Sequence, residues 1–403
     1  MPTARGRQRT LAWPRRSARF AACSCMSFAL VSVLSCAWRR FPCFSFQPQN
    51  SVPRAKSLPL VRKLAIGETA DFSTTEADEE EADRILQRLE AQGRQVAEDQ
   101  LEGSEEVKYQ PSTDPSDPIV AALRAVCNVS AVSRFELLDS RWNGNEAMRY
   151  DADDGRSFFI KMNRVEDTSV FMAEAVGLSA LLKAASGLKV PKPLHLGRLP
   201  KVGSIGPGAF MVLEWLQLMP FGIMRKDKQA ELGQKLAELH LNSVHDDLHK
   251  GRFGFPVSNF LALTPLDNTW CDTWEELFRR RLSDQISRLY VDKAYGRAAL
   301  YPDDRELADN GARMIAALPR LLALPADTRP SLIHGDLWMG NAGATKDAAV
   351  IFDPACCFAH HEFELAITDM FGGFEAPFWD AYFERIPRAA GFETRQKVYQ
   401  LRS

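Results

Sequence analysis

The first 67 residues contain no acidic side chain. They hold twelve Lys and Arg residues, and the first carboxylate of the chain is Glu68. Without these twelve, the 50 basic residues of the chain fall to 38 against 52 acidic ones, so the remainder carries a net charge of −14. A body this acidic argues against nucleic acid as a partner, because phosphate contacts need a basic surface.

Cysteine is also scarce in that body. Four of the eight cysteines lie within residues 1–67, and the other four are Cys127, Cys271, Cys356 and Cys357. These four show no spacing typical of a disulfide framework or a metal clip, and adjacent cysteines cannot pair without strain. We therefore expect the four cysteines beyond residue 67 to be reduced thiols. No internal repeat is evident either.

Residues 1–67 resemble a targeting leader. An Arg-rich start precedes the apolar run "FAACSCMSFALVSVLSCAW" (20–38), and a basic stretch with Ser and Pro follows. The first two parts are typical of a secretory signal, and the acid-poor third part is typical of a transit peptide. Together they predict a bipartite plastid (chloroplast) leader, with no stable membrane association after its removal. The alternatives are a membrane anchor, since the run approaches spanning length, or a mitochondrial leader.

Residues 68–117 are acidic and poor in aromatic residues, which predicts a disordered linker with one solvated helix from about Glu76 to Leu101. From Pro118, strand-like and helix-like patterns alternate, and beyond Phe221 the chain is mainly helical. The predicted helices are 168–186, 226–247, 270–291, 303–323, 375–384 and 393–402. Strands are expected in "SRFELLDS", "SFFIKMN", "KVPKPLHLGRL", "GAFMVLEWL", "SLIH" and "AAVIFD".

This order of elements predicts an α+β fold with two lobes. Residues 118–216 would form a small β-rich N-lobe and a hinge, and residues 217–403 a larger α-rich C-lobe. That is the layout of protein-kinase-like phosphotransferases. Phosphoryl transfer needs a cation on the nucleotide phosphates, oxygen ligands for Mg²⁺ and a carboxylate facing the acceptor hydroxyl.

The stretch "SLIHGDLWMGN" (331–341) has the spacing H-x-D-x-x-x-x-N of a kinase catalytic loop. Asp336 would accept the acceptor's proton, and Asn341 would offer its amide oxygen to Mg²⁺. Twelve residues later "VIFDPA" ends an apolar strand with Asp353, a costly place for a carboxylate unless it is paired or metal-bound. The turn-rich "AGATKDA" between them predicts a hairpin that brings Asn341 beside Asp353. A His-Gly-Asp sequence on its own would more often be a turn whose aspartate caps a helix. The matching spacing of Asn341 and Asp353 argues against that interpretation.

Lys161 lies between apolar neighbours in "FFIKMN", and Glu174 shares a helical face with Phe171, Ala175 and Leu178. A buried acid needs a partner, and an ion pair with Lys161 would satisfy both groups, as it does in kinases. A snorkelling lysine and a peripheral glutamate remain the alternative. "MVLEWL" (211–216) changes from apolar to amphipathic, as expected of a hinge that meets adenine.

Two other segments carry weaker signals. "DSRWNGNEAMRYDADDG" has no G-x-G-x-x-G, so a hairpin with an Asn-Gly turn is expected there. His360 and His361 with Glu362 and Glu364 could form a metal site, but we favour structural hydrogen bonds to the catalytic-loop backbone.

The blocks "HGDLWMGN", "IFDPA", "HHEFELAITDMFGGF", "YDADDGRSFFIKMN", "VPKPL", "FGFPVSNF" and "WCDTWEELFRRRL" resemble, in order, those of the fructosamine/ketosamine 3-kinase family. The resemblance covers roughly residues 118–401. It implies a fold similar to aminoglycoside and choline kinases, and ATP with Mg²⁺ as cofactors. It also implies phosphorylation of the third-carbon hydroxyl of a ketosamine, the rearranged adduct of a sugar and an amine. The unstable product frees a lysine, so the implied role is deglycation of proteins or of small ketosamines. Plastid members act on ribulosamine and erythrulosamine adducts.

Residue by residue, the resemblance implies Asp336 as proton acceptor, and Asn341 and Asp353 as Mg²⁺ ligands. Lys161, held by Glu174, would bind the phosphates. The adenine hinge would be Glu214, Trp215 and Leu216, and the substrate contacts would be Trp338 and His334. A flat indole at Trp338 suits the apolar face of a sugar.

The chain departs from the family pattern in two places. "SRWNGNEAM" has one glycine and no cysteine, so no disulfide switch is expected at that loop. The family also continues with an aromatic helical segment beyond the equivalent of "KVYQL", so we expect exposed apolar surface on the C-lobe.

Two other functions stay open at this point. One is a different small-molecule kinase of the aminoglycoside or choline type, whose cationic substrate an acidic cleft would suit. The other is a catalytically inactive kinase-like binding protein, against which Lys161, Asp336, Asn341 and Asp353 together argue. A protein kinase is disfavoured because no Ala-Pro-Glu anchor follows Asp353.

Overall fold

The computed structural model describes residues 111–138, 145–163, 168–185, 187–199, 208–219, 224–261, 264–291 and 305–401. The predicted leader, the linker helix at 76–101 and the Asn143-Gly144 turn lie outside these ranges. Among the described helices, none combines the length and apolar character that crossing a membrane requires. The four cysteines of the body are free thiols.

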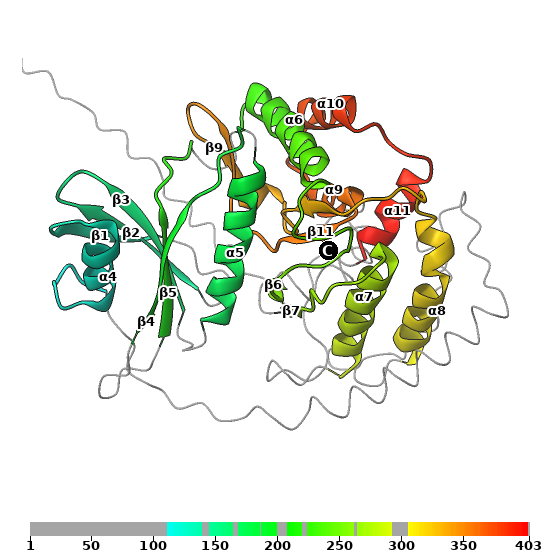
Figure 1. Ribbon diagram of the computed structural model, residues 1–403, viewed down its shortest axis with the longest axis horizontal. Helices are drawn as coiled ribbons and strands as arrows, with labels where there is room; N and C mark the ends of the chain where they lie inside the picture. The colour runs from blue at the N-terminus through cyan, green and yellow to red at the C-terminus, as the bar shows by residue number, and fades with distance from the viewer. Residues whose placement is uncertain are drawn as a thin grey trace, which may run out of the picture. The chain divides into compact units, whose positions relative to one another are not determined.

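An antiparallel five-stranded sheet forms the N-lobe (Figure 1). The strands follow one another in the order β1-β2-β3-β5-β4. Their bounds are β1 (Val132–Leu138), β2 (Glu146–Ala152), β3 (Ser157–Asn163), β4 (Pro193–Leu199) and β5 (Gly208–Glu214). Because side chains alternate between the two faces of a strand, Phe158, Ile160 and Met162 point to one face and Lys161 to the other.

Helix α4 (Pro118–Cys127) covers the Phe158 face through Ile119, Val120 and Leu123. The sequence analysis missed this helix. Its first turn is capped by Asp117, whose Oδ1 accepts the amide of Ile119 at 2.9 Å, and Ser112 donates to Oδ2 of the same side chain. These hydrogen bonds hold Ser112 and Asp117 at the start of α4.

Helix α5 (Ser169–Ala184) packs against the opposite face of the sheet and lies between the sheet and the C-lobe (Figure 1). Phe171 and Leu178 are buried there, as the helical periodicity predicts, and Leu181 is buried beside them. Glu174 lies on the same buried face.

The segment "RWNGNEAMRYDADDG" forms more than a connection between two strands. Residues 146–152 of it are β2, which pairs with both β1 and β3. The alternation of buried Met148, Tyr150 and Ala152 is the signal that identifies this strand. The antiparallel pairing of β1 and β2 agrees with the predicted hairpin, whose Asn-Gly turn lies outside the described residues.

Helices dominate the C-lobe, as predicted. They are α6 (Lys226–Ser243), α7 (Trp274–Val291), α8 (Arg305–Leu322), α9 (His361–Met370), α10 (Ala376–Arg385) and α11 (Phe392–Tyr399). Helix α9, which the sequence analysis missed, lies at the centre of the lobe (Figure 1). All of its residues from Glu362 to Thr368 are buried, so its polar side chains in this stretch face other parts of the lobe rather than solvent.

Three two-stranded ladders complete the lobe. They are β6–β7 (Asn259–Leu261 with Thr264–Leu266), β8–β11 (Ser331–Ile333 with Cys357–Ala359) and β9–β10 (Ala342–Ala344 with Ala349–Ile351). The predicted two-lobed α+β architecture is therefore confirmed.

A buried ion pair ties α9 to α11. The Arg395 guanidinium donates to both oxygens of Glu362, at 2.6 and 2.8 Å, and both side chains are almost fully buried. Two parallel hydrogen bonds compensate for the loss of water around both charges. Removing one partner would leave the other charge buried and unpaired.

We expect Arg395→Leu to lower the free energy of unfolding by about 3–5 kcal/mol, because Glu362 would lose its only cationic partner in the described core. Urea titration monitored by tryptophan fluorescence measures this change. Arg134→Leu is the matched control, since the Arg134–Glu136 pair is exposed and its loss should cost less than about 0.5 kcal/mol. Equal effects of the two substitutions would contradict the assignment.

Candidate functional site

The segment from Ser331 to Asp353 runs through the site, and two ladders hold it. Strand β8 leads into the loop, β11 pairs with β8, and the β9–β10 hairpin returns the chain to Asp353. The amide of Phe352 donates to the carbonyl of Asn341 at 3.1 Å, which closes the hairpin beside the loop. The hairpin predicted from "AGATKDA" is thus confirmed, and it brings Asn341 next to Asp353.

Gly335 makes the sharp turn before Asp336. Its φ of +84° lies in the left-handed region, and a Cβ at this position would collide with the backbone of Ala355. The amide of Ala355 also donates to the carbonyl of His334 at 2.8 Å. Only glycine meets both the conformation and the close approach of the two backbone segments.

Asp336 and Asn341 contact each other directly. The Asn341 side-chain amide donates to the Asp336 backbone carbonyl and to its carboxylate Oδ2, both at 2.9 Å, and to the carbonyl of Asp353 at 3.5 Å. With the nitrogen used as donor, the Asn341 carbonyl oxygen is left to accept from or bind a ligand.

Lys161 bridges the two lobes. Its ammonium donates to both carboxylate oxygens of Glu174 at 2.8 Å, and it also contacts Oδ1 of Asp353 in the C-lobe. The predicted Lys161–Glu174 ion pair is therefore present. Asp353 itself has a φ of +62°, a conformation that a non-glycine residue adopts only where the surroundings enforce it.

The two carboxylates differ in their protonation because only one ammonium is shared between them. Burial, with the nearby Asp353 charge, raises the pKa of Glu174 to about 7 even though Lys161 opposes the shift. Removal from water would also raise the pKa of Asp353, but the Lys161 ammonium outweighs it and holds that pKa below its usual value. Asp353 is thus the more fully ionised of the two carboxylates, and about half of its side chain is exposed.

The position of His334 does not agree with its predicted contact with substrate. The side chain is fully buried, its Nε2 donates to the carbonyl of Phe352 at 2.9 Å, and its Nδ1 accepts the amide of Asp336 at 3.3 Å. Burial lowers the pKa of His334, so the ring is neutral in this tautomer. The structure therefore places His334 beneath the loop, where it orients Asp336.

Glu364 and Thr368 of α9 hold the loop from below. The buried Glu364 carboxylate accepts the amides of His334 and Gly335 at 2.5 and 3.0 Å, and the Thr368 hydroxyl donates to the carbonyl of Leu337 at 3.0 Å. The predicted hydrogen bonds to the catalytic-loop backbone are confirmed for Glu364. Thr368 was missed, because its role depends on a contact with a distant segment.

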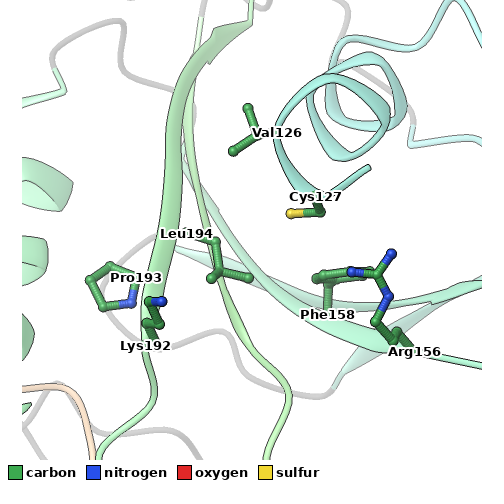
Figure 2. Close-up of a pocket in the computed structure, with 7 residues that line it drawn as sticks. All are labelled: Val126, Cys127, Arg156, Phe158, Lys192, Pro193 and Leu194. Carbon is green, nitrogen blue, oxygen red and sulfur yellow. The ribbon is translucent and has the colours of Figure 1, made fainter. Parts of the chain in front are cut away.

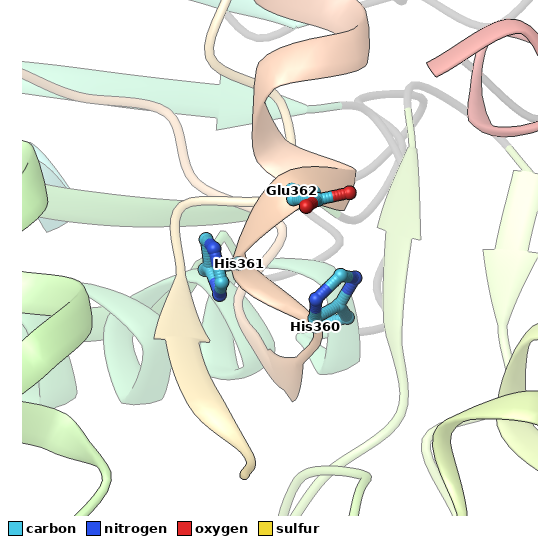
Figure 3. Close-up of side chains that lie close together, drawn as sticks. All are labelled: His360, His361 and Glu362. Carbon is cyan, nitrogen blue, oxygen red and sulfur yellow. The ribbon is translucent and has the colours of Figure 1, made fainter. Parts of the chain in front are cut away.

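His360, His361 and Glu362 lie close together at the start of α9 (Figure 3). Their potential ligand atoms all lie within 4.8 Å of one another. Glu362 is already paired with Arg395, and Nδ1 of His360 is hydrogen-bonded to the Tyr399 hydroxyl at 2.9 Å. These commitments favour a structural role, although the partners are α11 side chains rather than the catalytic-loop backbone.

The predicted hinge begins at Glu214, the last residue of β5. Trp215 lies on the Lys161 face of the sheet, where its ring contacts Phe159 and the Arg149 guanidinium, the latter 4.7 Å from the ring centroid. Glu214 is exposed, and its amide donates to the carbonyl of Lys192 at 2.9 Å. Among the described residues, none hydrogen-bonds to the backbone amide of Leu216.

A cavity of about 330 Å³ lies at the C-terminal end of α4, with Cys127, Phe158 and Leu194 among its walls (Figure 2). Because Phe158 and Lys161 point to opposite faces of β3, this cavity is separated from the site by the sheet. A second cavity of about 520 Å³ shares part of its lining and reaches Glu214 and Trp215.

Trp338, two residues after Asp336, is partly buried. Its ring lies against Gly340, where a Cβ would collide with the indole, and 5.9 Å from the ring of Phe371. Position and chemistry both suit the predicted contact with a sugar. Phe371 was not among the predicted site residues.

The fructosamine kinase family model matches residues 142–402. The chain belongs to the fructosamine kinase family. It is similar to the chloroplastic protein-ribulosamine 3-kinase of Oryza sativa subsp. indica, with 38% identity over 64% of this chain and 68% of that protein. It is also similar to the ketosamine-3-kinase of Mus musculus, with 32% identity over 64% of this chain and 83% of that protein.

Solved structures agree in fold. A Haemophilus somnus protein assigned as a fructosamine-3-kinase superposes with a TM-score of 0.57 at 23% identity, covering 70% of this chain and 86% of that one. One from Thermobifida fusca gives 0.52 at 25% identity, covering 70% and 88%. The predicted kinase-like fold and kinase class are confirmed by this family membership.

The buried histidines should make the fold acid-sensitive. Burial, with nearby His240 and Arg395, lowers the pKa of His361 from 6.5 to about 3. Between these values the unfolded chain binds a proton that the native ring does not, so stability is full above pH 6.5 and falls as the pH is lowered. The loss is at most about 1.4 kcal/mol per pH unit.

We therefore expect His361→Gln to flatten the fall in unfolding free energy between pH 6.5 and 4, measured by urea titration at several pH values. His245→Gln, at an exposed position, is the control and should leave the profile unchanged. A His361→Gln profile parallel to that of the wild type would contradict the burial argument.

Proposed function

We propose that this protein is an ATP-dependent ketosamine 3-kinase that phosphorylates the third-carbon hydroxyl of sugar–amine adducts on lysine. The observation that carries the proposal is Lys161, shared between Glu174 and Asp353 at one side of the site, with Asp336 and Asn341 hydrogen-bonded to each other at the other. The names of the ribulosamine and ketosamine kinase relatives support the substrate class.

In this proposal the Lys161 ammonium binds the nucleotide phosphates, and Glu174 keeps it in place. The adenine meets the hinge formed by Glu214, Trp215 and Leu216, where the Leu216 amide offers a backbone donor. The ring of Trp215, on the same face of the sheet as Lys161, borders the nucleotide. Binding across both lobes would hold the γ-phosphate near Asp336.

The donor set suits Mg²⁺. Asn341 contributes an amide oxygen and Asp353 an exposed carboxylate with a lowered pKa, and hard cations prefer such oxygen ligands. When bound, the ion neutralises charge on the phosphates. The Asp353 carboxylate also contacts the Lys161 ammonium.

Asp336 serves as the proton acceptor. As the third-carbon oxygen forms its bond to the γ-phosphorus, its proton passes to the Asp336 carboxylate, and the bond from that phosphorus to the β–γ bridging oxygen breaks to release ADP. His334 orients Asp336 by accepting its backbone amide, and Asn341 orients the carboxylate by donating to its Oδ2. Trp338 supports the apolar face of the sugar.

The phosphorylated adduct is unstable and releases the free amine, so the activity repairs glycated lysines on proteins or in small molecules. The chloroplastic names of the plant relatives, together with the basic leader, support a plastid location.

A substrate panel tests the proposal. We expect the full chain to form ADP with ribulose-lysine and fructose-lysine but not with kanamycin, measured by an assay that couples ADP to NADH oxidation. Turnover of kanamycin alone would show instead that the chain is an aminoglycoside kinase. Binding of ATP without turnover of any acceptor would favour an inactive binding protein.

Asp336→Asn should lower kcat by about 10²–10⁴-fold, because the amide cannot accept the hydroxyl proton. ATP affinity should change by less than roughly twofold, since Lys161 and the hinge carry the nucleotide. Steady-state kinetics and calorimetry with ATP separate the two effects. Wild-type turnover by this variant would exclude Asp336 as the base.

A further inference from the structure

Phe371 is a large aromatic side chain that remains 49% exposed at the end of α9. A single exposed apolar residue needs no explanation by itself. This ring, however, lies 5.9 Å from that of Trp338, and the two planes are inclined by 60°. The two rings therefore form an aromatic corner, defined here as Trp338 and Phe371. Trp338 lies two residues beyond Asp336 in the chain.

Two contacts and a sharp turn hold the corner to the catalytic loop. Thr368, one turn before Phe371, donates to the carbonyl of Leu337 at 3.0 Å. Gly373 has a φ of +94°, and a Cβ there would lie only 2.9 Å from the Met339 side chain. Gly372 also has a positive φ, of +69°. The backbone after α9 thus turns sharply against the loop, which sets where the Phe371 ring lies.

The chemistry of the proposed acceptor matches such a corner. In a ketosamine the nitrogen is bonded to the first carbon of the sugar, two carbon atoms from the hydroxyl that faces Asp336. This secondary amine is protonated near neutral pH. A cation over the face of Trp or another aromatic ring is attracted by the negative charge of the ring face, and two inclined faces can attract it together.

We infer that Trp338 and Phe371 together bind the positively charged amine of the adduct, and that Phe371 is a specificity residue that distinguishes amine adducts from neutral sugars. The inference rests on the proposed function for the identity of the acceptor. In the proposed function Trp338 also supports the sugar, so a substitution of Trp338 would affect both contacts. A substitution of Phe371 tests the contact with the amine alone.

The test compares a cationic and a neutral ligand. The cationic ligand is ribulose-lysine with its α-amine blocked, and the neutral one is the same compound acetylated on the ketosamine nitrogen. Phe371→Leu removes the π face but keeps an apolar side chain, and Phe371→Tyr keeps the ring. Leu248→Ala, at another position that is 46% exposed, is the matched control outside the site.

For the full-length enzyme, we expect Phe371→Leu to raise KM for the cationic adduct roughly three- to tenfold, with the loss in kcat/KM carried by KM. Phe371→Tyr should restore KM to within about twofold of the wild type. The neutral analogue should show the same KM in wild type and Phe371→Leu. Equal shifts for both ligands, failure of the tyrosine variant to rescue, or a loss confined to kcat would overturn the inference.

Calorimetry separates this inference from the proposed function. The Asp336→Asn protein, with and without Phe371→Leu, is titrated with both ligands in the absence of turnover. Weaker binding of the cationic ligand alone supports the corner, even if the wild type phosphorylates no ketosamine and the proposed function fails. If ketosamines are phosphorylated but both ligands bind alike to the two proteins, the function stands and the corner is wrong. No measurable binding of the cationic ligand to either protein would also overturn it.

Discussion

One ammonium group between two carboxylates holds the lobes in register at the site. Lys161 extends from the N-lobe sheet, Glu174 from the helix behind it, and Asp353 from the C-lobe hairpin. A single positive charge cannot neutralise two anions in a poorly hydrated place, so the pKa of Glu174 rises while that of Asp353 stays low. In the proposed function, the same charge arrangement would supply a cation for phosphate and a carboxylate for a metal ion.

The rest of the C-lobe provides a rigid base for that arrangement. Glu364 accepts two amides of the loop, and the Glu362–Arg395 pair fixes the helix from which Glu364 extends. Both carboxylates are buried, where an unpaired charge would be costly, so their partners must remain in place. This network, built from backbone amides and one guanidinium, holds the loop that carries Asp336.

Aromatic surface completes the acceptor side. Trp338 lies against the turn at Gly340, and Phe371 faces it from the end of α9, a helix that Thr368 ties to the loop. One helix therefore supports the loop from below and carries, at its end, the ring that faces Trp338. In the proposed function, α9 would link the catalytic loop to the recognition of the amine adduct.

The sequence by itself determined the elements with strong periodicity and the chemistry with strict spacing. The helix around Phe171 and Leu178, the spacing of Asp336 and Asn341, and the hairpin that returns to Asp353 follow from local pattern, because each depends on residues close together in the chain. Even the Lys161–Glu174 pair could be predicted, since a buried acid on a helical face requires a nearby cation.

The tertiary structure decided what depends on distant segments. Helix α9 is buried from Glu362 to Thr368, and only packing shows that Glu364 accepts loop amides while Glu362 binds Arg395. His334 belongs to the same motif as Asp336, yet it is buried beneath the loop, and Phe371 became a site residue only when α9 brought it to Trp338. Spacing along a chain specifies which groups are present, whereas burial and the approach of remote backbone specify which of them can meet a ligand.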